Sequence, residues 1–342
     1  MLSANGIRYV DLFCGIGGFR LAIGQATREL GLDATCALSC DIDESCQDAY
    51  EANFGERPLG DIRAIVADDV PDHNLLLAGF PCQPFSIIGS MLGFEDTRGT
   101  LFFEICRILE RKKPEAFVLE NVKLLVGHKK GRTLKKILHS LAHLGYAVDF
   151  KVLNSLDFGL PQKRERIFIV GFRAPSRALF WPQGVSKMTP LEEILEKRVA
   201  KKYYASDRII KSRLAAHKKR SYATIWHENK AGHISAYPYS CALRAGASYN
   251  YLLVNGERRL TPREMLRLQG FPDTYKIVCN YSQTRKQAGN SVSVPVVSAV
   301  LRSVLETLGY ISGQEKPGAT MTEQYAGTAS ENCPEVQAAL SS

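Results

Sequence analysis

Residues 11–19 read DLFCGIGGF and form a glycine-rich turn between an apolar stretch, residues 9–13, and a helical pattern, residues 20–30. In a doubly wound α/β sheet, such a strand-to-helix turn lets the backbone approach a nucleotide-like ligand. The G-x-G-G spacing differs from the G-x-G-x-x-G of dinucleotide-binding folds, so pyrophosphate binding is not predicted. A tight turn also requires glycine for conformational reasons alone, and this stretch by itself leaves both interpretations open.

Short apolar runs alternate with helix-length amphipathic stretches through the first 173 residues. The runs that read as strands are residues 9–13, 34–39, 74–79, 116–119, 150–154 and 167–171, and one more strand is expected just before Gly60. The helical stretches are residues 20–30, 44–53, 100–111 and 133–144, and residues 292–308 read as a closing helix. This alternation predicts an α/β fold with a mostly parallel sheet.

The composition narrows the class of protein. The 342 residues carry 44 Lys and Arg against 35 Asp and Glu, a net charge of +9. This charge favours a polyanionic partner, although it equally fits a ribosome-associated or merely soluble basic protein. The nine cysteines make no CxxC pair and no zinc-ligand spacing, so we expect mostly free thiols and no metal. Without a membrane-length apolar run or a secretion signal, the chain is expected to be cytoplasmic and free of membrane.

Carboxylates follow two strands of the predicted sheet. Asp41 and Asp43 come after residues 34–39, and Asp61 comes after the strand expected before Gly60. Carboxyl ends of parallel strands meet at one edge of a sheet, where ligands bind. A carboxylate after the second strand can accept both ribose hydroxyls, and Asp61 can accept from an adenine amino group. Together with the glycine turn, these residues predict an adenosyl pocket.

Cys82 lies between Pro81 and Pro84, just after residues 74–79. A lone cysteine is more often a buried apolar residue than a nucleophile. However, Glu120 ends the next strand, and Arg164 and Arg166 precede residues 167–171, so that a thiol, a carboxyl and two guanidiniums converge at one edge. The plainer interpretations are a helix-start carboxylate for Glu120 and a solvated strand entrance for the arginines. Their convergence favours Cys82 as a thiolate nucleophile.

Six motifs follow one another along the chain: DLFCGIGG at 11–18, GFPCQPFS at 79–86, ENV at 120–122, QKRER at 162–166, RLTPREMLRLQGFP at 259–272 and GNSV at 289–292. In this order they resemble the DNA (cytosine-5) methyltransferases, most closely the compact bacterial enzymes of type II restriction-modification systems. The resemblance covers residues 8–308. It implies a Rossmann-like, S-adenosylmethionine-dependent methyltransferase sheet with a smaller inserted target recognition domain, and methylation of one cytosine within a short duplex sequence.

The resemblance also implies catalytic roles for Cys82, Glu120, Arg164 and Arg166. Cys82 matches the nucleophile that adds to carbon 6 of cytosine and makes carbon 5 reactive. Glu120 matches the group that protonates or hydrogen-bonds N3, and Arg166 matches the arginine at O2. Arg164 is expected near the cysteine or the DNA backbone. Because a thiol cannot reach a stacked base, the cytosine must be flipped out. Residues 86–99 match the loop that closes over it, with Ser86 and Arg98 as DNA contacts.

For the cofactor, the resemblance carries over residues from both ends of the chain. They are Phe13, Gly15, Gly17, Gly18, Asp41, Ile42, Asp61, Ile62, Pro81, Leu101, Asn290, Ser291 and Val292. The position of Ile42 is often aromatic in the family, so the aliphatic side chain predicts weaker stacking on the adenine. The product is expected to be S-adenosylhomocysteine.

Residues 1–182 plus 286–310 are predicted to form the catalytic and cofactor-binding domain, and residues 183–285 the target recognition domain. Residues 311–342 are expected to be a disordered tail. Between residues 197 and 220, ten Lys and Arg face a single acid, Asp207. The predicted DNA contacts there and beyond are Lys201, Lys202, Lys211, Lys218, Lys219, Arg220 and Arg244. Arg244, Asn250, His233 and Tyr249 are the candidate base readers.

Two other functions compete with this interpretation. A tRNA cytosine-5 methyltransferase shares the catalytic motifs, although the large basic, aromatic-rich insert disfavours it. A catalytically silent DNA-binding relative would not need Cys82, Glu120 and the cofactor motifs. We therefore expect a DNA cytosine-5 methyltransferase whose partner is double-stranded DNA. It is expected to act as a monomer and to protect host DNA from a cognate restriction endonuclease without a required physical complex.

Overall fold

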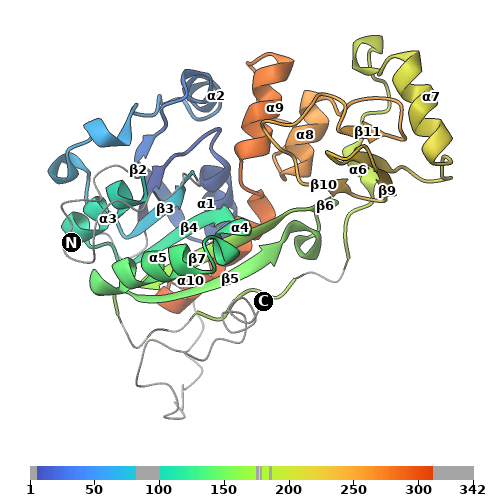
Figure 1. Cartoon of the computed structure of the whole chain (residues 1–342). Helices are drawn as coiled ribbons and strands as arrows, with labels where there is room; N and C mark the ends of the chain where they lie inside the picture. The colour runs from blue at the N-terminus through green and yellow to red at the C-terminus, as the bar shows by residue number, and fades with distance from the viewer. Residues whose placement is uncertain (1–5, 82–100, 175–176, 178, 185–186, 311–342) are drawn as a thin grey trace.

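The computed structural model describes residues 6–81, 101–174, 177, 179–184 and 187–310 (Figure 1). A six-stranded sheet forms its larger lobe, in the order β2-β1-β3-β4-β7-β5. The strands are β1 (Gly6–Leu12), β2 (Asp33–Cys40), β3 (Leu75–Gly79), β4 (Ala116–Val122), β5 (Ala147–Asn154) and β7 (Glu165–Phe172). The first four pair in parallel, and β7 runs antiparallel to both β4 and β5. The predicted α/β class with a mostly parallel sheet is confirmed.

Alternating side chains of the strands feed two hydrophobic cores, one on each face of the sheet. Tyr9, Leu75 and Val118 join the core that contains α1 (Gly18–Glu29) and α10 (Val294–Leu308). Val10, Leu76 and Leu119 join the core that contains α3 (Leu101–Lys112) and α5 (Arg132–His143). Since both faces are covered, the central strands are near-continuous apolar runs, which is why they stand out in the sequence.

Residues 191–290 form a smaller lobe, to the right of the sheet in Figure 1. Its antiparallel sheet is built from β8 (Ile225–Glu228), β9 (Ile234–Tyr237) and β11 (Leu252–Val254). Its helices are α6 (Leu191–Ile194), α7 (Asp207–Ala216), α8 (Pro262–Leu268) and α9 (Tyr281–Asn290). The boundary predicted between residues 285 and 286 falls inside α9. The division into domains otherwise stays a prediction.

A short strand pair joins the two lobes. β6 (Gln162–Lys163), just before β7, pairs in parallel with β10 (Ser240–Cys241) of the smaller lobe. The main chain of Ser240 also donates to the carbonyl of Pro161, at 2.8 Å. The QKRER motif therefore lies where the lobes meet, and not simply at a solvated strand entrance.

The strand expected before Gly60 is absent from the described residues. Leu59 makes only an isolated bridge with Cys40, at the open edge of β2, and a short 3-10 helix (Ile62–Ala64) follows. Pro58 has no N–H to donate to a sheet, and Gly60 weakens a strand, so pairing stops after one residue. The polypeptide still returns to the edge of β2, which leaves Asp61 beside the end of that strand.

Residues Tyr281–Leu308 have the length and hydropathy of a membrane span, but their packing indicates a core segment. The most apolar window of this run is 61% buried inside the protein. The run is also two helices, because α9 ends at Asn290 and α10 begins at Val294. We therefore interpret it as part of the protein core.

Candidate active site

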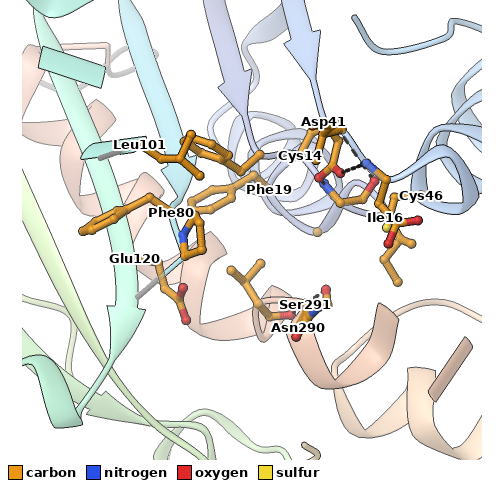
Figure 2. Close-up of a pocket in the computed structure, with 18 of the residues that line it drawn as sticks. Cys14, Ile16, Phe19, Asp41, Cys46, Phe80, Leu101, Glu120, Asn290 and Ser291 are labelled. Atoms are coloured by element: carbon orange, nitrogen blue, oxygen red, sulfur yellow. Dashed lines mark hydrogen bonds between the residues drawn. The ribbon is translucent and has the colours of Figure 1, made fainter. Parts of the chain in front are cut away.

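A cavity of about 590 Å³ opens at the carboxyl ends of β1 to β4 (Figure 2). In Figure 2, Asp41 and Cys46 lie toward one side of it, and Glu120, Phe80 and Leu101 toward the other, with Asn290 and Ser291 between them. Of the thirteen predicted cofactor residues, Gly17 alone does not line it. Glu120, Arg164 and Arg166 line the same cavity. The structure therefore brings Glu120, Arg164 and Arg166 into one space with twelve of the thirteen predicted cofactor residues.

The glycine turn depends on backbone angles and close contacts that only glycine allows. Gly15 and Gly17 have φ angles of +54° and +81°, in the left-handed region that favours glycine. A Cβ at Gly17 would lie 2.2 Å from a ring carbon of Phe54, and one at Gly18 would lie 2.7 Å from a methyl of Val292. Gly17 thus shapes the turn without lining the cavity, whereas Gly18 admits the segment that returns from the far end of the chain.

Asp41 anchors the glycine turn to the end of β2. Its carboxylate accepts from the main-chain N–H of Gly15 at 2.8 Å and from that of Asp43 at 2.9 Å, as Figure 2 shows. Burial raises the pKa of this carboxyl, and the two N–H donors oppose the rise. Next to it, the Ile42 side chain is 67% exposed at the cavity wall. An acceptor carboxylate beside an open apolar surface suits a ribose carrying a flat base.

Asp61 and Asp43 are engaged by cations. Asp61 caps the short helix Ile62–Ala64 and pairs with Arg63, which lowers the pKa of its carboxyl. Asp43 caps α2 (Glu44–Phe54) and pairs with Lys286 of α9 at 2.7 Å. Asp61 still borders the cavity, but its oxygens already have a donor. A contact to an adenine amino group would therefore have to share the carboxylate with Arg63.

Glu120 and Arg166 form a buried ion pair at the far side of the cavity. Arg166 Nε lies 3.1 Å from Glu120 Oε1, and both side chains are largely shielded from water. Burial raises the pKa of the Glu120 carboxyl, although Arg166 and Arg164 act in the opposite direction. The carboxyl can therefore hold a proton at higher pH than an exposed glutamate, as a proton donor to a ring nitrogen must.

Arg164 is 2% exposed and points into the junction of the lobes. Its guanidinium donates to the main-chain carbonyls of Leu243 at 3.1 Å, Gly289 at 3.1 Å and Ser291 at 2.6 Å. Burial lowers the pKa of this group to about 9. It lines the cavity beside Arg166, but its bonds go to the protein main chain.

Asn121 is a site residue to which the sequence analysis assigned no role. Its Nδ2 donates to the carbonyl of Phe80 at 2.9 Å, and its side chain is buried. This bond fixes the main chain that leads from β3 into Pro81. A second polar residue after Glu120 at the end of an apolar strand was the available signal, but its partner follows a different strand and cannot be identified from the sequence.

Cys82, Ser86 and Arg98 lie outside the described residues, whereas Cys14, Cys40 and Cys46 border the cavity. Burial raises the pKa of each of these three thiols, that of Cys40 to about 12. All seven described cysteines are free thiols. The described cavity cysteines are thus poorly suited to act as thiolates at neutral pH.

The predicted DNA contacts of the smaller lobe are at its surface. Those with exposed side chains are Lys201, Lys202, Lys211, Lys218, Lys219, Arg220 and Arg244. Lys219 pairs with Glu257. The Arg244 guanidinium lies 4.9 Å from the Tyr251 ring centroid. Among the other candidate base readers, His233 and Tyr249 are exposed and Asn250 is half-buried.

Comparisons with known proteins agree with this geometry. The family model described as C-5 cytosine-specific DNA methylase matches residues 7–306. The Type II methyltransferase M.NgoBI of Neisseria gonorrhoeae is 58% identical over 293 residues, which are 85% of this chain and 90% of that protein. The Type II methyltransferase M.HaeII of Haemophilus aegyptius is 55% identical over 302 residues, 87% of this chain and 93% of that protein.

Among solved structures, a mutant of Spodoptera frugiperda DNMT2 superposes with a TM-score of 0.68 and 20% identity, over 87% of this chain and 99% of that one. A putative DNA modification methyltransferase from an Escherichia coli prophage gives 0.67 and 19%, over 89% and 99%. At these identities the likeness concerns the fold alone. With its family model matched over residues 7–306, the chain belongs to the C-5 cytosine-specific DNA methylases and is a DNA (cytosine-5) methyltransferase.

Proposed function

We propose that this enzyme methylates carbon 5 of one flipped-out cytosine in a short double-stranded DNA sequence, with S-adenosylmethionine as methyl donor and a Cys82 adduct as intermediate. The observation that carries the proposal is the shared cavity. The buried Glu120–Arg166 pair and the Asp41–Ile42 wall face the same 590 Å³ space. Pro81, the residue before Cys82, borders it as well.

The residues present fit S-adenosylmethionine. Asp41 offers carboxylate oxygens for ribose hydroxyls, and the exposed Ile42 offers a surface for the adenine. Gly18 and Val292 bring the two ends of the chain together at the glycine turn. When bound, this cofactor supplies the electrophilic methyl group that carbon 5 of the cytosine takes up. Metal-ligand clusters of three or more His, Cys, Asp or Glu are not found in the described part of the chain.

The chain's own residues perform the remaining steps. The Cys82 thiolate forms a bond to carbon 6, and the electron pair of the 5,6 double bond moves through the ring toward N3. Glu120 gives its proton, or a strong hydrogen bond, to N3, and Arg166 keeps the carboxyl in place. After carbon 5 has gained the methyl group, its proton leaves to a base. The carbon 6–sulfur bond then breaks, which restores the double bond and the thiolate, and N3 returns any proton it has taken to Glu120.

DNA must deliver the cytosine to this cavity outside the stacked duplex, at a cost of about a few kcal/mol. The exposed cations of the smaller lobe supply the sequence-independent part of the affinity. Relatives at 55–58% identity are named Type II methyltransferases, so the tRNA alternative is not favoured. We further propose that the enzyme acts as a monomer and protects host DNA from a cognate restriction endonuclease.

Bisulfite sequencing of plasmid DNA from a host that expresses the enzyme tests this function. We expect protected cytosines at one position of one short sequence. The purified enzyme should also transfer labelled methyl groups from S-adenosylmethionine to duplex DNA carrying that sequence. Transfer to tRNA but not to duplex DNA would reverse the assignment.

The substitution Gly18→Ala tests the cofactor cradle. The added Cβ would lie 2.7 Å from Val292 and 3.0 Å from Ser291 Oγ, and must push this segment away from the turn. Overpacking of this kind costs about 1–3 kcal/mol, so we expect the KM for S-adenosylmethionine to rise about tenfold. Gly24→Ala, in the same helix with open space around it, is the control and should leave KM unchanged. Equal KM values for both variants would argue against the cradle.

The salt dependence of DNA affinity tests the proposed phosphate contacts of the smaller lobe. Lys211, Lys218 and Arg220 are exposed, whereas Lys219 is paired with Glu257. Each phosphate contact that is lost should make the slope of log affinity against log salt shallower by about 0.9. We expect the triple alanine variant of the three exposed residues to lose at least about one unit of slope, and Lys219→Ala much less. An unchanged slope in the triple variant would place the DNA elsewhere.

A further inference from the structure

Arg164 connects the smaller lobe to the cofactor cavity. One Nη donates to the carbonyl of Leu243, which follows β10 in the smaller lobe. The other donates to the carbonyls of Gly289 and Ser291, which flank Asn290 at the cavity wall. The remaining donor, Nε, is buried and has no hydrogen-bond partner among the described residues. All the hydrogen bonds described for this side chain therefore go to the main chain, to Leu243 on one side and to the end of α9 and Ser291, at the cavity wall, on the other.

The main chain of Leu243 is held from two directions. Its N–H donates to Gln162 Oε1 at 2.9 Å, while its carbonyl accepts from Arg164. Gln162 is itself fully buried, and its Nε2 donates to the carbonyl of Leu268 at 2.8 Å. Gln162 and Arg164 thus fix the main chain of Leu243. The residues that follow Leu243 therefore start from a fixed position.

Residues 244–250, here called the recognition loop, begin directly after Leu243. They also rest on α9, because a Cβ at Gly289 would lie 2.5 Å from the main-chain N of Ala245. Arg285 of α9 donates to the carbonyl of Ala247 at 2.6 Å. A shift of residues 289–291 would therefore change the position of both Arg164 and the recognition loop.

The recognition loop presents side chains that suit base edges or phosphates. Arg244, Ser248 and Tyr249 are exposed. The main-chain N–H of Arg244 donates to the Tyr251 hydroxyl at 2.9 Å, and its guanidinium lies over the Tyr251 ring. Its guanidinium has no carboxylate partner among the described residues, which leaves it available to guanine or phosphate.

We propose that Arg164 is a positioning residue that couples the recognition loop to the cofactor cavity, so that each ligand strengthens binding of the other. The inference rests on the proposed function and replaces the catalytic role predicted for Arg164. A cofactor against Asn290 and Ser291 steadies the carbonyls that Arg164 holds, and through Leu243 it steadies the loop. DNA bound to the recognition loop stabilises residues 289–291 in turn, through the same hydrogen bonds of Arg164. Such coupling is reciprocal by thermodynamic necessity.

Lysine cannot replace arginine in this arrangement. The planar guanidinium spans three carbonyls with donors at fixed angles, whereas an ammonium is a single compact centre. In Arg164→Lys we expect the ammonium to bind either Leu243 or the carbonyls of Gly289 and Ser291, so that the connection between the two sides is lost while the charge remains. Arg258→Lys is the matched control, because Arg258 is also buried but binds Glu264, outside the junction.

The test measures duplex DNA binding with and without S-adenosylhomocysteine, which permits no turnover. In the wild type we expect each ligand to raise the binding affinity of the other about 5- to 150-fold, and both affinities to rise by the same factor. In Arg164→Lys the factor should fall toward one while both ligands still bind singly, and in Arg258→Lys it should equal the wild-type value. At saturating ligands, kcat of Arg164→Lys should stay within about tenfold of the wild type, with the main loss in KM.

Three results would overturn the inference: no coupling in the wild type, full coupling in Arg164→Lys, or a kcat loss above about a hundredfold with coupling intact. The last would place Arg164 on the reacting base. Hydrogen exchange on the wild type needs no variant, and S-adenosylhomocysteine should slow exchange at residues 243–247. Unchanged exchange there would also reject the coupling. Loss of the proposed function would show separately, as a wild type that transfers no methyl group.

Discussion

Cys82→Ala is expected to lower methyl transfer by at least about a thousandfold, because it removes the thiol that we propose forms the bond to carbon 6. DNA binding should persist, since the proposed phosphate contacts are in the smaller lobe. Cys106→Ala is the control. This thiol belongs to α3 and is buried in the core, and burial raises its pKa to about 12, so its loss should cost stability modestly and leave the rate intact.

The adduct itself can be trapped. In DNA with 5-fluorocytosine at the target position, carbon 5 carries fluorine, which cannot leave as the proton does. The reaction should therefore stop after methyl transfer with sulfur still bonded to carbon 6. We expect a complex that survives denaturing electrophoresis for the wild type and Cys82-intact controls, and none for Cys82→Ala. A stable complex with Cys82→Ala would assign the nucleophile to another residue.

Glu120→Gln is expected to lower kcat about a hundredfold or more, the usual contribution of a positioned proton donor. Burial raises the pKa of the Glu120 carboxyl, so the protonated form persists to higher pH than in an exposed glutamate. As pH rises through that pKa the proton is lost, and the rate should fall on the alkaline side. Glutamine has no proton to lose, so this limb should be missing from its pH profile.

Glu104→Gln is the matched control for this prediction. Glu104 borders the same cavity, but it pairs with Arg107 on its own helix at 2.8 Å. Its removal should leave both the rate and the pH profile close to the wild type. If Glu120→Gln keeps the alkaline limb, the titrating group is a different one.

Most of the sheet could be predicted from the sequence, because its central strands are buried on both faces and carry runs such as residues 75–78. The strand expected before Gly60 was wrong in the described structure. An edge position with Pro58 beside it supports only one bridging residue. The local sequence pattern could not distinguish a central strand from the segment before Gly60. Whether a segment at the edge of a sheet forms a strand depends on residues far away in the chain.

The sequence placed Asp41, Ile42 and Glu120 at the ends of neighbouring strands, and the structure has all three at the cavity, although their roles stay predictions. Roles that depend on a distant partner were not accessible. Asn121 binds Phe80, and Arg164 binds Leu243, Gly289 and Ser291. Gly17 serves the turn through its backbone angle and its closeness to Phe54. The roles of Cys82, Ser86 and Arg98 stay predictions.

The contact between Gly18 and Val292 means that the cofactor cavity is completed by residues from opposite ends of the polypeptide. A ribosome makes the glycine turn first and the GNSV segment about 270 residues later. A nascent or prematurely terminated chain that stops before this segment therefore has the thiol and the acid, but an open cavity. We therefore expect methylation competence only after the GNSV segment has been made, and two fragments divided within the smaller lobe should be inert apart and active only when reassembled.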